Sequence, residues 1–461
     1  MAHTTEGTRR RFLKGAGVAA VAGIAGCSGG QGDGQDVSSG ATGTTTGSPS
    51  TTEIQFMHAQ GGPFGELLDT IITRFNDQSS TAQVNPSFKG FYFETFNAIK
   101  SAIKAGNPPA IAQLVDVTQR QMIDSQAFVP VEDLLEVNWD DFYDPPKNYW
   151  SVDGTTWGLP FPTDYGINYY NKTKFEEAGL DPEDPPTTFQ EMIDTSETLM
   201  SEGVVDHGIT WPTSSFYVEQ WHAETGNVLF DRRNGQAGNP TEAYLTDDAM
   251  MSIADWWMEM ANNEYYLHTG KGSEGGWTAA IEAFNSQDAA MIYGSTAAAM
   301  SRRKAAENNG FEVGNAFTPA PSDSRAGVIP GGGSLWVADG VSDAKKEAAV
   351  EFLEFLQEPE QQLLWTKNTG YLPTTQSTTD RLEDENWFDN NPMDRTALEQ
   401  MKAIKDVPAT NGWLAGPGQK IRDTITAAYA NMTTTDVTAE EAMSDAESTI
   451  ESALRSYAES T

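Results

Sequence analysis

The sequence predicts an α/β protein with parallel strands, and its length predicts two lobes. Short apolar runs alternate along the chain with runs whose apolar residues recur at helical spacing, which is the pattern of strands connected by helices. The structured part extends from Glu53 to Tyr457, about 405 residues, which is more than a single hydrophobic core usually supports.

The elements near the start of this part show the alternation most clearly. Residues 54–58 predict a short strand, and residues 110–117 predict an apolar strand that contains one charge, Asp116. Residues 91–105 predict a helix that stops at Gly106. Between them, Gly61-Gly62-Pro63 starts another helix, whose apolar face consists of Leu67, Leu68, Ile71, Ile72 and Phe75.

Two later helices are predicted from capping boxes, in which a threonine is followed three residues later by a glutamate. Thr188 and Glu191 start a helix that runs to about residue 201, and Thr438 and Glu441 start the last helix of the chain.

In open α/β sheets, ligands bind beyond the carboxyl ends of the strands. This rule selects four places that each follow an apolar run: His58, Asp116, the segment after Leu159-Pro160-Phe161, and Gly294-Ser295. We therefore expect these places to meet at a ligand site.

The first 27 residues predict an export signal. Residues 8–14 contain the arginines of a twin-arginine signal, and the apolar run 15–26 is too short to span a bilayer. Cys27 lies at a lipobox, where it would be acylated and become the mature N-terminus. Residues 28–52 are mostly Ser, Gly, Thr, Gln and Asp and predict a flexible tether. We expect a protein exported by the twin-arginine pathway and lipid-anchored on the extracellular face of the cell membrane.

The formal net charge of the chain is −37. The signal holds four of the 29 basic residues and one of the 66 acidic ones, so the remaining chain carries 25 basic and 65 acidic residues, or −40. Such a field repels nucleic acid, and we expect no nucleic-acid partner. The acids are scattered along the chain, which is typical of a halophile's surface, and we expect an archaeal halophile.

The sequence contains no motif of a known catalytic or metal site. It has no phosphate-binding G-x-x-x-x-G-K-[ST] loop, no H-E-x-x-H and no G-x-S-x-G. Its five histidines are dispersed, and Cys27 is its single cysteine, so no internal disulfide and no cysteine cluster can form. We expect no enzymatic activity, no cofactor and no metal.

Several longer motifs carry a resemblance. The chain contains Tyr-Tyr-Asn-Lys at 169–172, Phe-Glu-Glu-Ala-Gly-Leu-Asp-Pro at 175–182, Pro-Pro-Thr-Thr-Phe at 185–189, Asp-Ala-Ala-Met at 288–291, Gly-Gly-Gly-Ser-Leu-Trp-Val at 331–337, Glu-Phe-Leu-Glu-Phe-Leu at 351–356 and Thr-Gly-Tyr-Leu-Pro at 369–373. In this order, these motifs resemble the family 1 extracellular solute-binding proteins of ABC importers. Residues 331–337 and 369–373 are most similar to the members that bind sn-glycerol-3-phosphate.

The resemblance implies a two-lobed, type II periplasmic-binding-protein-like fold with the ligand held in a cleft between the lobes. The family pattern places lobe one at 53–162 plus 296–345 and lobe two at 163–295 plus 346–461. It also implies a receptor that captures a small solute outside the cell and delivers it to permease subunits in the membrane.

Carried over to this sequence, the resemblance places one set of residues on the cleft: Tyr92, Asp116, Thr163 or Asp164, Ser295, Gly332 and Tyr371. Physical arguments leave alternatives open for these residues. Asp116 could accept polyol hydroxyls or cap the next helix, and Ser295 could bind an anion or serve as an ordinary N-cap. The glycine run at 331–333 could be a plain loop. Tyr92, Tyr371 and the more remote candidate His58 could belong to the core.

The chain departs from the glycerol-phosphate-binding pattern in one important place. Those relatives carry a phosphate-binding arginine near the C-terminus, and residues 411–416, which stand at that place, contain none. Trp413, in the same segment, offers a flat face for a sugar ring. We therefore expect a sugar or other polyol as ligand, with sn-glycerol-3-phosphate or a glycerophosphodiester as the alternative and a lipid-anchored sugar-active enzyme as a more remote one.

Overall fold

The structure is a computed structural model that describes residues 51–271 and 274–461. Pro49–Thr461 form one compact unit. The predicted signal at 1–27, Cys27 with it, and residues 28–50 of the predicted tether lie outside the described residues. Within the described ranges, no helix is long and apolar enough to cross a membrane.

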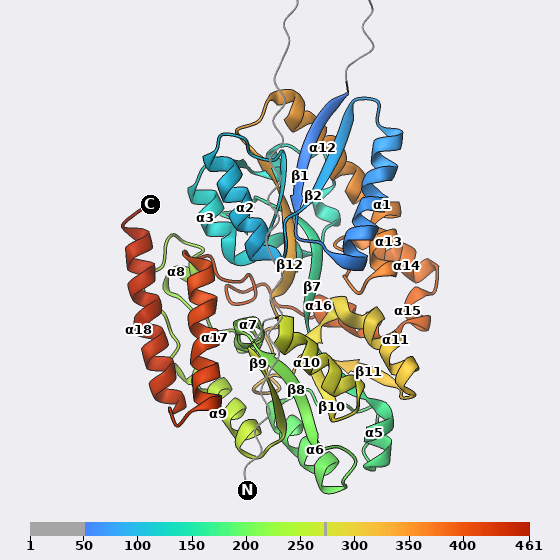
Figure 1. Cartoon of the computed structure of the whole chain (residues 1–461), viewed down its shortest axis with the longest axis vertical. Coiled ribbons are helices and arrows are strands. Elements are labelled where there is room, and N and C mark those ends of the chain that lie inside the picture. Colours follow the sequence, from blue (N-terminus) through green and yellow to red (C-terminus); the bar gives the residue numbers. More distant parts are fainter. Residues whose placement is uncertain (1–50, 272–273) are drawn as a thin grey trace, which may run out of the picture. The chain divides into compact units, whose positions relative to one another are not determined.

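Ten strands form one sheet at the centre of this unit (Figure 1). They are β1 (Thr52–His58), β2 (Ala82–Phe88), β3 (Ile111–Leu114), β4 (Phe128–Val129), β7 (Leu159–Asn171), β8 (His207–Thr213), β9 (Tyr266–Lys271), β10 (Ala289–Ser295), β11 (Val313–Ala316) and β12 (Pro330–Ala338). The main order is β2-β1-β3-β12-β7-β10-β8-β9, with β4 paired to β12 and β11 paired to β7. A separate hairpin pairs β5 (Ser151–Val152) with β6 (Thr155–Thr156).

The sheet is mixed, so the prediction of parallel strands is correct for only part of it. β2, β1 and β3 are parallel to one another, and so are β10, β8 and β9. Between these two parallel blocks, β12 is antiparallel to β3 and to β7, and β7 is antiparallel to β10. A buried apolar strand has the same sequence pattern in either direction, which is why the alternation of elements did not reveal the antiparallel pairs.

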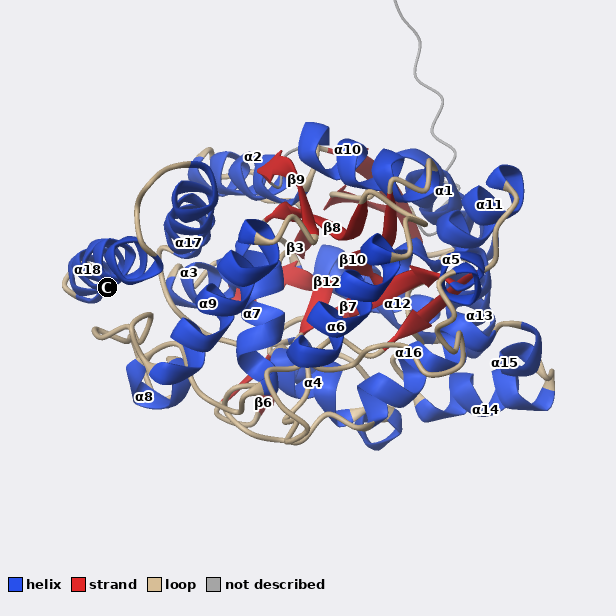
Figure 2. Ribbon diagram, turned by 90° about the horizontal axis from the view of Figure 1, so that it is seen from below, coloured by secondary structure: helices blue, strands red, loops and turns tan. Residues whose placement is uncertain are grey.

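Helices lie on both sides of the strands (Figure 2). The first half of the chain contributes α1 (Gly62–Gln78), α2 (Tyr92–Lys104), α3 (Gln119–Asp124), α4 (Asp144–Tyr149), α5 (Lys172–Glu177), α6 (Phe189–Ser201), α7 (Ser215–Glu224) and α8 (Asp231–Asn234). The second half contributes α9 (Asp248–Asn262), α10 (Glu274–Asn285), α11 (Ala299–Asn309), α12 (Asp343–Gln357), α13 (Pro359–Asn368), α14 (Gln376–Asp384), α15 (Trp387–Asn390), α16 (Pro392–Lys402), α17 (Gly418–Thr434) and α18 (Ala439–Ala458).

The predicted helices are confirmed. The buried side chains of α1 are Leu68, Ile71, Ile72 and Phe75, which is the predicted apolar face without Leu67. α2 ends before Gly106, which has the positive φ expected where a helix stops. Both capping boxes are formed, at Thr188 for α6 and at Thr438 for α18.

Two strands differ from their predicted extent. β3 ends at Leu114 rather than at residue 117, because Asp116 already begins a short 3₁₀ helix, η1 (Asp116–Thr118). β7 does not end after Phe161 but continues to Asn171, and all 13 of its residues are buried. Thr163 and Asp164 therefore lie inside a long strand and not at the carboxyl end of one.

The C-terminal part of the chain packs against the first strands. Phe352 of α12 contacts the rings of Phe56 in β1 and Phe75 in α1, with ring centroids 6.0 and 5.2 Å apart. Phe352 and its neighbours share one apolar cluster with Ile54 and Val84 of the β1–β2 pair. The lobe boundaries stay a prediction. This packing places α12 beside the strands of the predicted lobe one, although most of α12 was predicted in lobe two.

The register between β7 and β12 depends on a glycine. β12 has an irregular register between Gly332 and Ser334, and Gly332 has φ of 84°. A Cβ at position 332 would lie 2.0 Å from the carbonyl oxygen of Pro162, which is backbone and cannot move aside. Both facts require glycine at this position.

We predict that Gly332→Ala lowers the free energy of unfolding by about 1–3 kcal/mol, because alanine adds both a clash and an unfavourable φ. Urea unfolding followed by circular dichroism measures the change. Gly340→Ala is the matched control, because a Cβ there would meet only Pro108, at an ordinary 3.5 Å, and we expect a change below about 0.5 kcal/mol. Equal effects of the two substitutions would contradict the assignment of strain to Gly332.

Candidate functional site

A cavity of about 620 Å³ opens beside the central strands. This volume is within the usual range for a small-molecule site. Its lining residues are Tyr92, Phe93, Val115, Asp116, Asp164, Thr213, Ser214, Ser215, Phe216, Trp277, Ser295, Gly331, Gly332, Tyr371, Arg422, Asp423, Thr426 and Ala427. They come from both parallel blocks, from β7 and β12, and from the starts of α2, α7 and α17.

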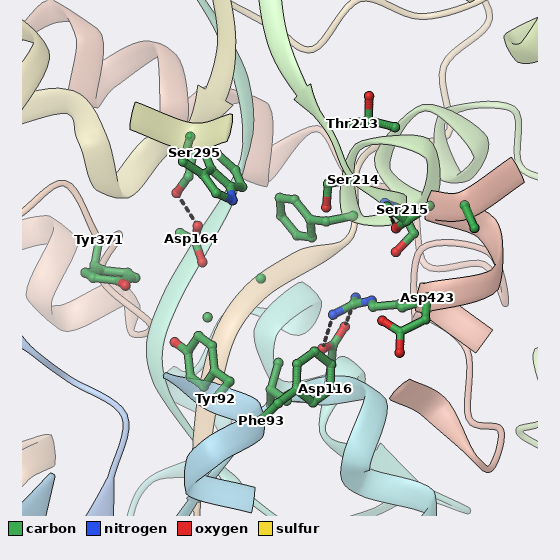
Figure 3. Close-up of a pocket in the computed structure, with 18 residues that line it drawn as sticks. Tyr92, Phe93, Asp116, Asp164, Thr213, Ser214, Ser215, Ser295, Tyr371 and Asp423 are labelled. Atoms are coloured by element: carbon green, nitrogen blue, oxygen red, sulfur yellow. Dashed lines mark hydrogen bonds and ion pairs between the residues drawn. The ribbon is translucent and has the colours of Figure 1, made fainter. Parts of the chain in front are cut away.

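Six of the predicted site residues meet at this cavity: Tyr92, Asp116, Asp164, Ser295, Gly332 and Tyr371. Figure 3 shows Asp164, Ser295, Tyr371 and Tyr92 on one side of the cavity and Asp116 with Asp423 on the other. Their role in binding stays a prediction, but their convergence from six separate parts of the sequence is a property of the fold.

The pairing of β7 with both of its neighbours brings Asp164 to this place. Asp164 is directly opposite Gly331 of β12, and Gly166, two residues further along β7, is opposite Ser295 of β10. Because alternate residues of a strand point to the same face, Asp164 and the last residue of β10 lie close together. The Ser295 hydroxyl donates a hydrogen bond to Oδ2 of Asp164.

Ser295 has a second role as an N-cap. Its hydroxyl oxygen accepts a hydrogen bond of 3.1 Å from the backbone N–H of Ala297, at the start of the 3₁₀ helix η4 (Thr296–Ala298) that leads into α11. The predicted alternative of an ordinary N-cap is therefore confirmed, and the same side chain also faces the cavity.

Asp164 is a buried carboxylate, with 7% of its surface exposed. The pKa of Asp164 is raised to about 6, chiefly by burial; the hydrogen bond from Ser295 lowers this pKa, and the negative charge of Asp116 raises it. Among the side chains at 51–270 and 276–461, no lysine, arginine or histidine forms an ion pair with Asp164.

Asp116 lies in a different environment, because its carboxylate pairs with Arg422 of α17. Arg422 donates to both oxygens of Asp116, at 3.1 and 2.7 Å, and to both oxygens of Glu219 in α7, at 2.9 and 2.8 Å. The hydroxyl of Tyr149 donates to Oδ2 of Asp116 at 2.5 Å. Although burial alone would lower the pKa of Arg422, the two carboxylates raise it above its usual value.

An arginine lines the cavity, although not in the segment where the resemblance places one. The segment 411–416 contains none, but Arg422 lies six residues further along, on the first turns of α17, and lines the cavity. It does not lie there as a free cation, since Asp116 and Glu219 together bring one more negative charge than Arg422 neutralises.

Three predicted residues do not line the cavity. Trp413 is buried against the ring of Phe230, and its indole N–H donates to Glu219 at 3.0 Å, so it supports the ion pairs from behind. Thr163 precedes Asp164 in β7 and therefore points to the other face of the sheet. His58 lies beside a separate, smaller cavity near Gly61, where burial lowers its pKa.

Sequence reasoning missed several polar and aromatic residues of the site. Ser214 and Ser215 follow β8, so the rule of strand carboxyl ends would have selected them if β8 had been recognised. Phe93, Phe216 and Trp277 carried no signal, because an aromatic residue on a helix has the same pattern in a core as in a cavity.

The described part of the chain offers no group of three or more His, Cys, Asp or Glu side chains arranged to hold a metal ion. The polar groups of the cavity are carboxylates, hydroxyls and the engaged guanidinium of Arg422. This set suits hydrogen bonds to a hydroxyl-rich organic ligand.

Comparison with known proteins identifies related sequences. Residues 70–397 match the family described as bacterial extracellular solute-binding protein. The sn-glycerol-3-phosphate-binding periplasmic protein UgpB of Pectobacterium atrosepticum is 28% identical over 427 residues, which cover 90% of this chain and 94% of the relative. The protein of the same name from Escherichia coli K12 is 28% identical over 420 residues, or 89% of this chain and 94% of that relative.

Solved structures share the fold. UgpB from Mycobacterium tuberculosis, in complex with glycerophosphocholine, matches with a TM-score of 0.71 and 19% identity over 88% of this chain and all of that one. The sugar-binding protein MalE of Xanthomonas citri matches with a TM-score of 0.73 and 17% identity over 88% of this chain and 98% of that one. The predicted two-lobed, type II fold class is confirmed by these neighbours.

We predict that Arg422→Met lowers the free energy of unfolding by about 3–5 kcal/mol, because it leaves two buried carboxylates without their cation. Urea unfolding measures the loss. Adding Glu219→Gln should recover part of it, since one of the two uncompensated charges is then removed. Arg381→Met, which breaks the exposed pair with Glu360, is the control and should cost less than about 1 kcal/mol. A loss of that size for Arg422→Met would contradict the importance of the buried pairs.

We predict that Asp164 makes the protein less stable as the pH rises. Its pKa is raised from 3.8 to about 6, so the folded state holds the proton more tightly than the unfolded state does. The resulting stabilisation is present below pH 4 and is lost as the pH rises through 6, by an amount of about 3 kcal/mol. Asp164→Asn removes this dependence. Unfolding measured at pH 4 and pH 7 should therefore show the variant gaining on the wild type at pH 7, and a pH-independent difference would contradict the prediction.

Proposed function

The chain belongs to the bacterial extracellular solute-binding proteins and is a solute receptor of an ABC importer, and on this basis we propose that it captures a sugar or other polyol. It would bind this solute outside the cell and deliver it to permease subunits in the membrane. The transport step is driven by ATPases on the cytoplasmic side.

The observation that carries the polyol proposal is the state of Arg422. Its guanidinium donates four hydrogen bonds to the carboxylates of Asp116 and Glu219. It therefore does not present a free pair of N–H donors to a phosphate. The oxygen atoms of the cavity, by contrast, accept and donate in the way that sugar hydroxyls require. Aromatic rings such as those of Trp277 and Tyr92 offer faces for the apolar side of a sugar ring.

The alternative is sn-glycerol-3-phosphate or a glycerophosphodiester. The names of the relatives support it, and so does the presence of an arginine at the cavity. It requires Arg422 to exchange one carboxylate for the phosphate. Asp164 and Asp423, which also line the cavity, oppose the approach of an anion.

We propose that the chain closes on its ligand by bending between two lobes. The two parallel blocks of the sheet, joined only through β12 and β7, support the division at 53–162 plus 296–345 and 163–295 plus 346–461. The packing of Phe352 on Phe56 and Phe75 supports moving α12 into lobe one.

We propose export by the twin-arginine pathway and a lipid anchor at Cys27, supported by the sequence of residues 8–27. The mass of the mature N-terminal peptide tests this proposal, because acylation at Cys27 adds the mass of the acyl chains and removal of the signal exposes Cys27 as the first residue. A peptide that begins upstream of Cys27 would contradict it.

We propose that no chemistry is performed on the solute. The opposing hypothesis, a sugar-active enzyme, requires two acids that face each other, one with a raised pKa. The raised pKa of Asp164 fulfils one part of this requirement. Asp116 does not supply the other part, because Arg422 and Tyr149 occupy both of its oxygens.

The experiment that tests the proposal is a thermal-shift screen of the protein in about 2–3 M KCl, which screens the charge of the chain. The panel contains neutral sugars, linear polyols, sn-glycerol-3-phosphate and glycerophosphodiesters. A ligand at 100 times its Kd adds about 2.7 kcal/mol, a shift of several degrees. A shift with a sugar or polyol is expected. A shift with sn-glycerol-3-phosphate alone would overturn the polyol proposal in favour of the alternative.

A further inference from the structure

We propose that the solute carries a positively charged nitrogen beside its hydroxyl groups and that this cation pairs with Asp164. The inference rests on the proposed function and deepens it, since it names the class of polyol: an amino sugar or a polyol that bears an ammonium group. Both share the chemistry of a cation next to hydroxyls.

Asp164 is a buried carboxylate without a cationic partner among the side chains at 51–270 and 276–461. A carboxylate inside a protein is ordinarily paired with a cation, because burying an uncompensated charge is costly. Asp116, the other buried carboxylate of the cavity, is paired in this way, because Arg422 lies between Asp116 and Glu219. Asp164 is just as buried, and yet none of the cationic side chains at 51–270 and 276–461 pairs with it.

The oxygen of Asp164 that Ser295 does not engage is accessible from the cavity. Ser295 engages Oδ2 of Asp164. The other oxygen, Oδ1, faces Gly331 and Gly332, where an added Cβ would come within 2.9 and 3.1 Å of it. Because both neighbours are glycines, no side chain from β12 covers Oδ1 on the side of the cavity. The same short distances leave no room for a ligand between Oδ1 and the two glycines. A ligand group reaches the carboxylate from the cavity that Asp164 and Phe216 line.

Two tyrosine side chains line the cavity near Asp164. Tyr92 and Tyr371 lie on the same side of the cavity as Asp164 (Figure 3). Asp164 also helps to raise the pKa of both hydroxyls, which places the two rings within its electrostatic reach. Aromatic faces beside a carboxylate attract an ammonium group through the ring quadrupole as well as through its charge.

The charge of Asp164 disfavours anionic and neutral ligands relative to cationic ones. An anion at this end of the cavity would face Asp164 without a free cation to offset the repulsion. A neutral sugar can donate hydroxyl hydrogen bonds to Asp164 but leaves its charge uncompensated in a buried place. A cation compensates that charge and uses the same oxygen, so the site discriminates in its favour.

The test compares pairs of solutes that differ in a cationic group. D-glucosamine is measured beside D-glucose, D-galactosamine beside D-galactose, and 1-amino-1-deoxy-D-sorbitol beside D-sorbitol. The first two pairs represent amino sugars and the third a linear polyol with an ammonium group, so the panel also distinguishes the two sources of the cation. Dissociation constants are determined by titration calorimetry at pH 7 with the full chain.

We expect the cationic member of at least one pair to bind about tenfold or more tightly than its partner. In Asp164→Asn, that preference should fall to about twofold or less, because the amide keeps the shape of the carboxylate but not its charge. Asp436→Asn is the charge-matched control: Asp436 is exposed and lies beyond the far end of α17, about 20 Å from Arg422 along the helix. It should leave the preference unchanged.

Each other outcome decides against the inference in a recognisable way. If a neutral sugar of the panel or of the wider screen binds as tightly as every cationic solute, the inference is overturned and the proposed function stands. If the preference survives in Asp164→Asn, the cation pairs elsewhere and the assignment to Asp164 is overturned. If no sugar, polyol or ammonium solute binds, the proposed function fails and the inference fails with it. The wild-type comparison needs no variant and decides even if Asp164→Asn does not fold.

Discussion

The pairing of β7 with β12 and β10 is the constraint on which the cavity depends. β7 is buried along its whole length, pairs with β12 over its first half and with β10 over its second, and thereby joins the two parallel blocks of the sheet. A shift of register by one residue would turn every side chain of β7 to the opposite face. Asp164 would then leave the cavity, and Gly332 could no longer pass the carbonyl of Pro162.

Arg422 determines the charge of one end of this cavity, and Asp164 determines that of the other. At the first end, Arg422 pairs with two carboxylates, one of which also accepts a hydrogen bond from the indole of Trp413, so this end carries a net negative charge. At the second end, the carboxylate of Asp164 has no cationic partner among the side chains at 51–270 and 276–461 and is surrounded by a serine hydroxyl, two glycines and two tyrosines. The site is therefore polarised along its length, and a ligand that carries both hydroxyls and a cation has a favoured orientation in it.

The local features of the chain were predictable from the sequence, and the long-range ones were not. Capping boxes and the apolar face of α1 depend on residues a few positions apart, and the sequence shows them directly. The resemblance selected Gly332 and Tyr371 within its motifs, and the rule of strand carboxyl ends selected Asp116 and Ser295. Arg422 escaped because its partner Asp116 is 306 residues away, and no local pattern records a contact across that distance. Trp413 was misplaced because an indole beside the site and an indole on its wall look the same in a sequence.

Similarity to proteins named for glycerol phosphate identifies the family of the receptor but does not by itself identify its solute. A fold of this kind holds its ligand with a few side chains, so the ligand can change while the rest of the sequence keeps its likeness. In this chain a buried carboxylate, Asp164, lies at one end of the cavity, and the arginine at the other end is already neutralised by two carboxylates. A phosphate would have to displace a carboxylate from Arg422 and tolerate Asp164, whereas a cationic polyol requires neither change. The charges of the cavity are therefore the basis on which we propose a cationic polyol, and not a phosphate, as the ligand.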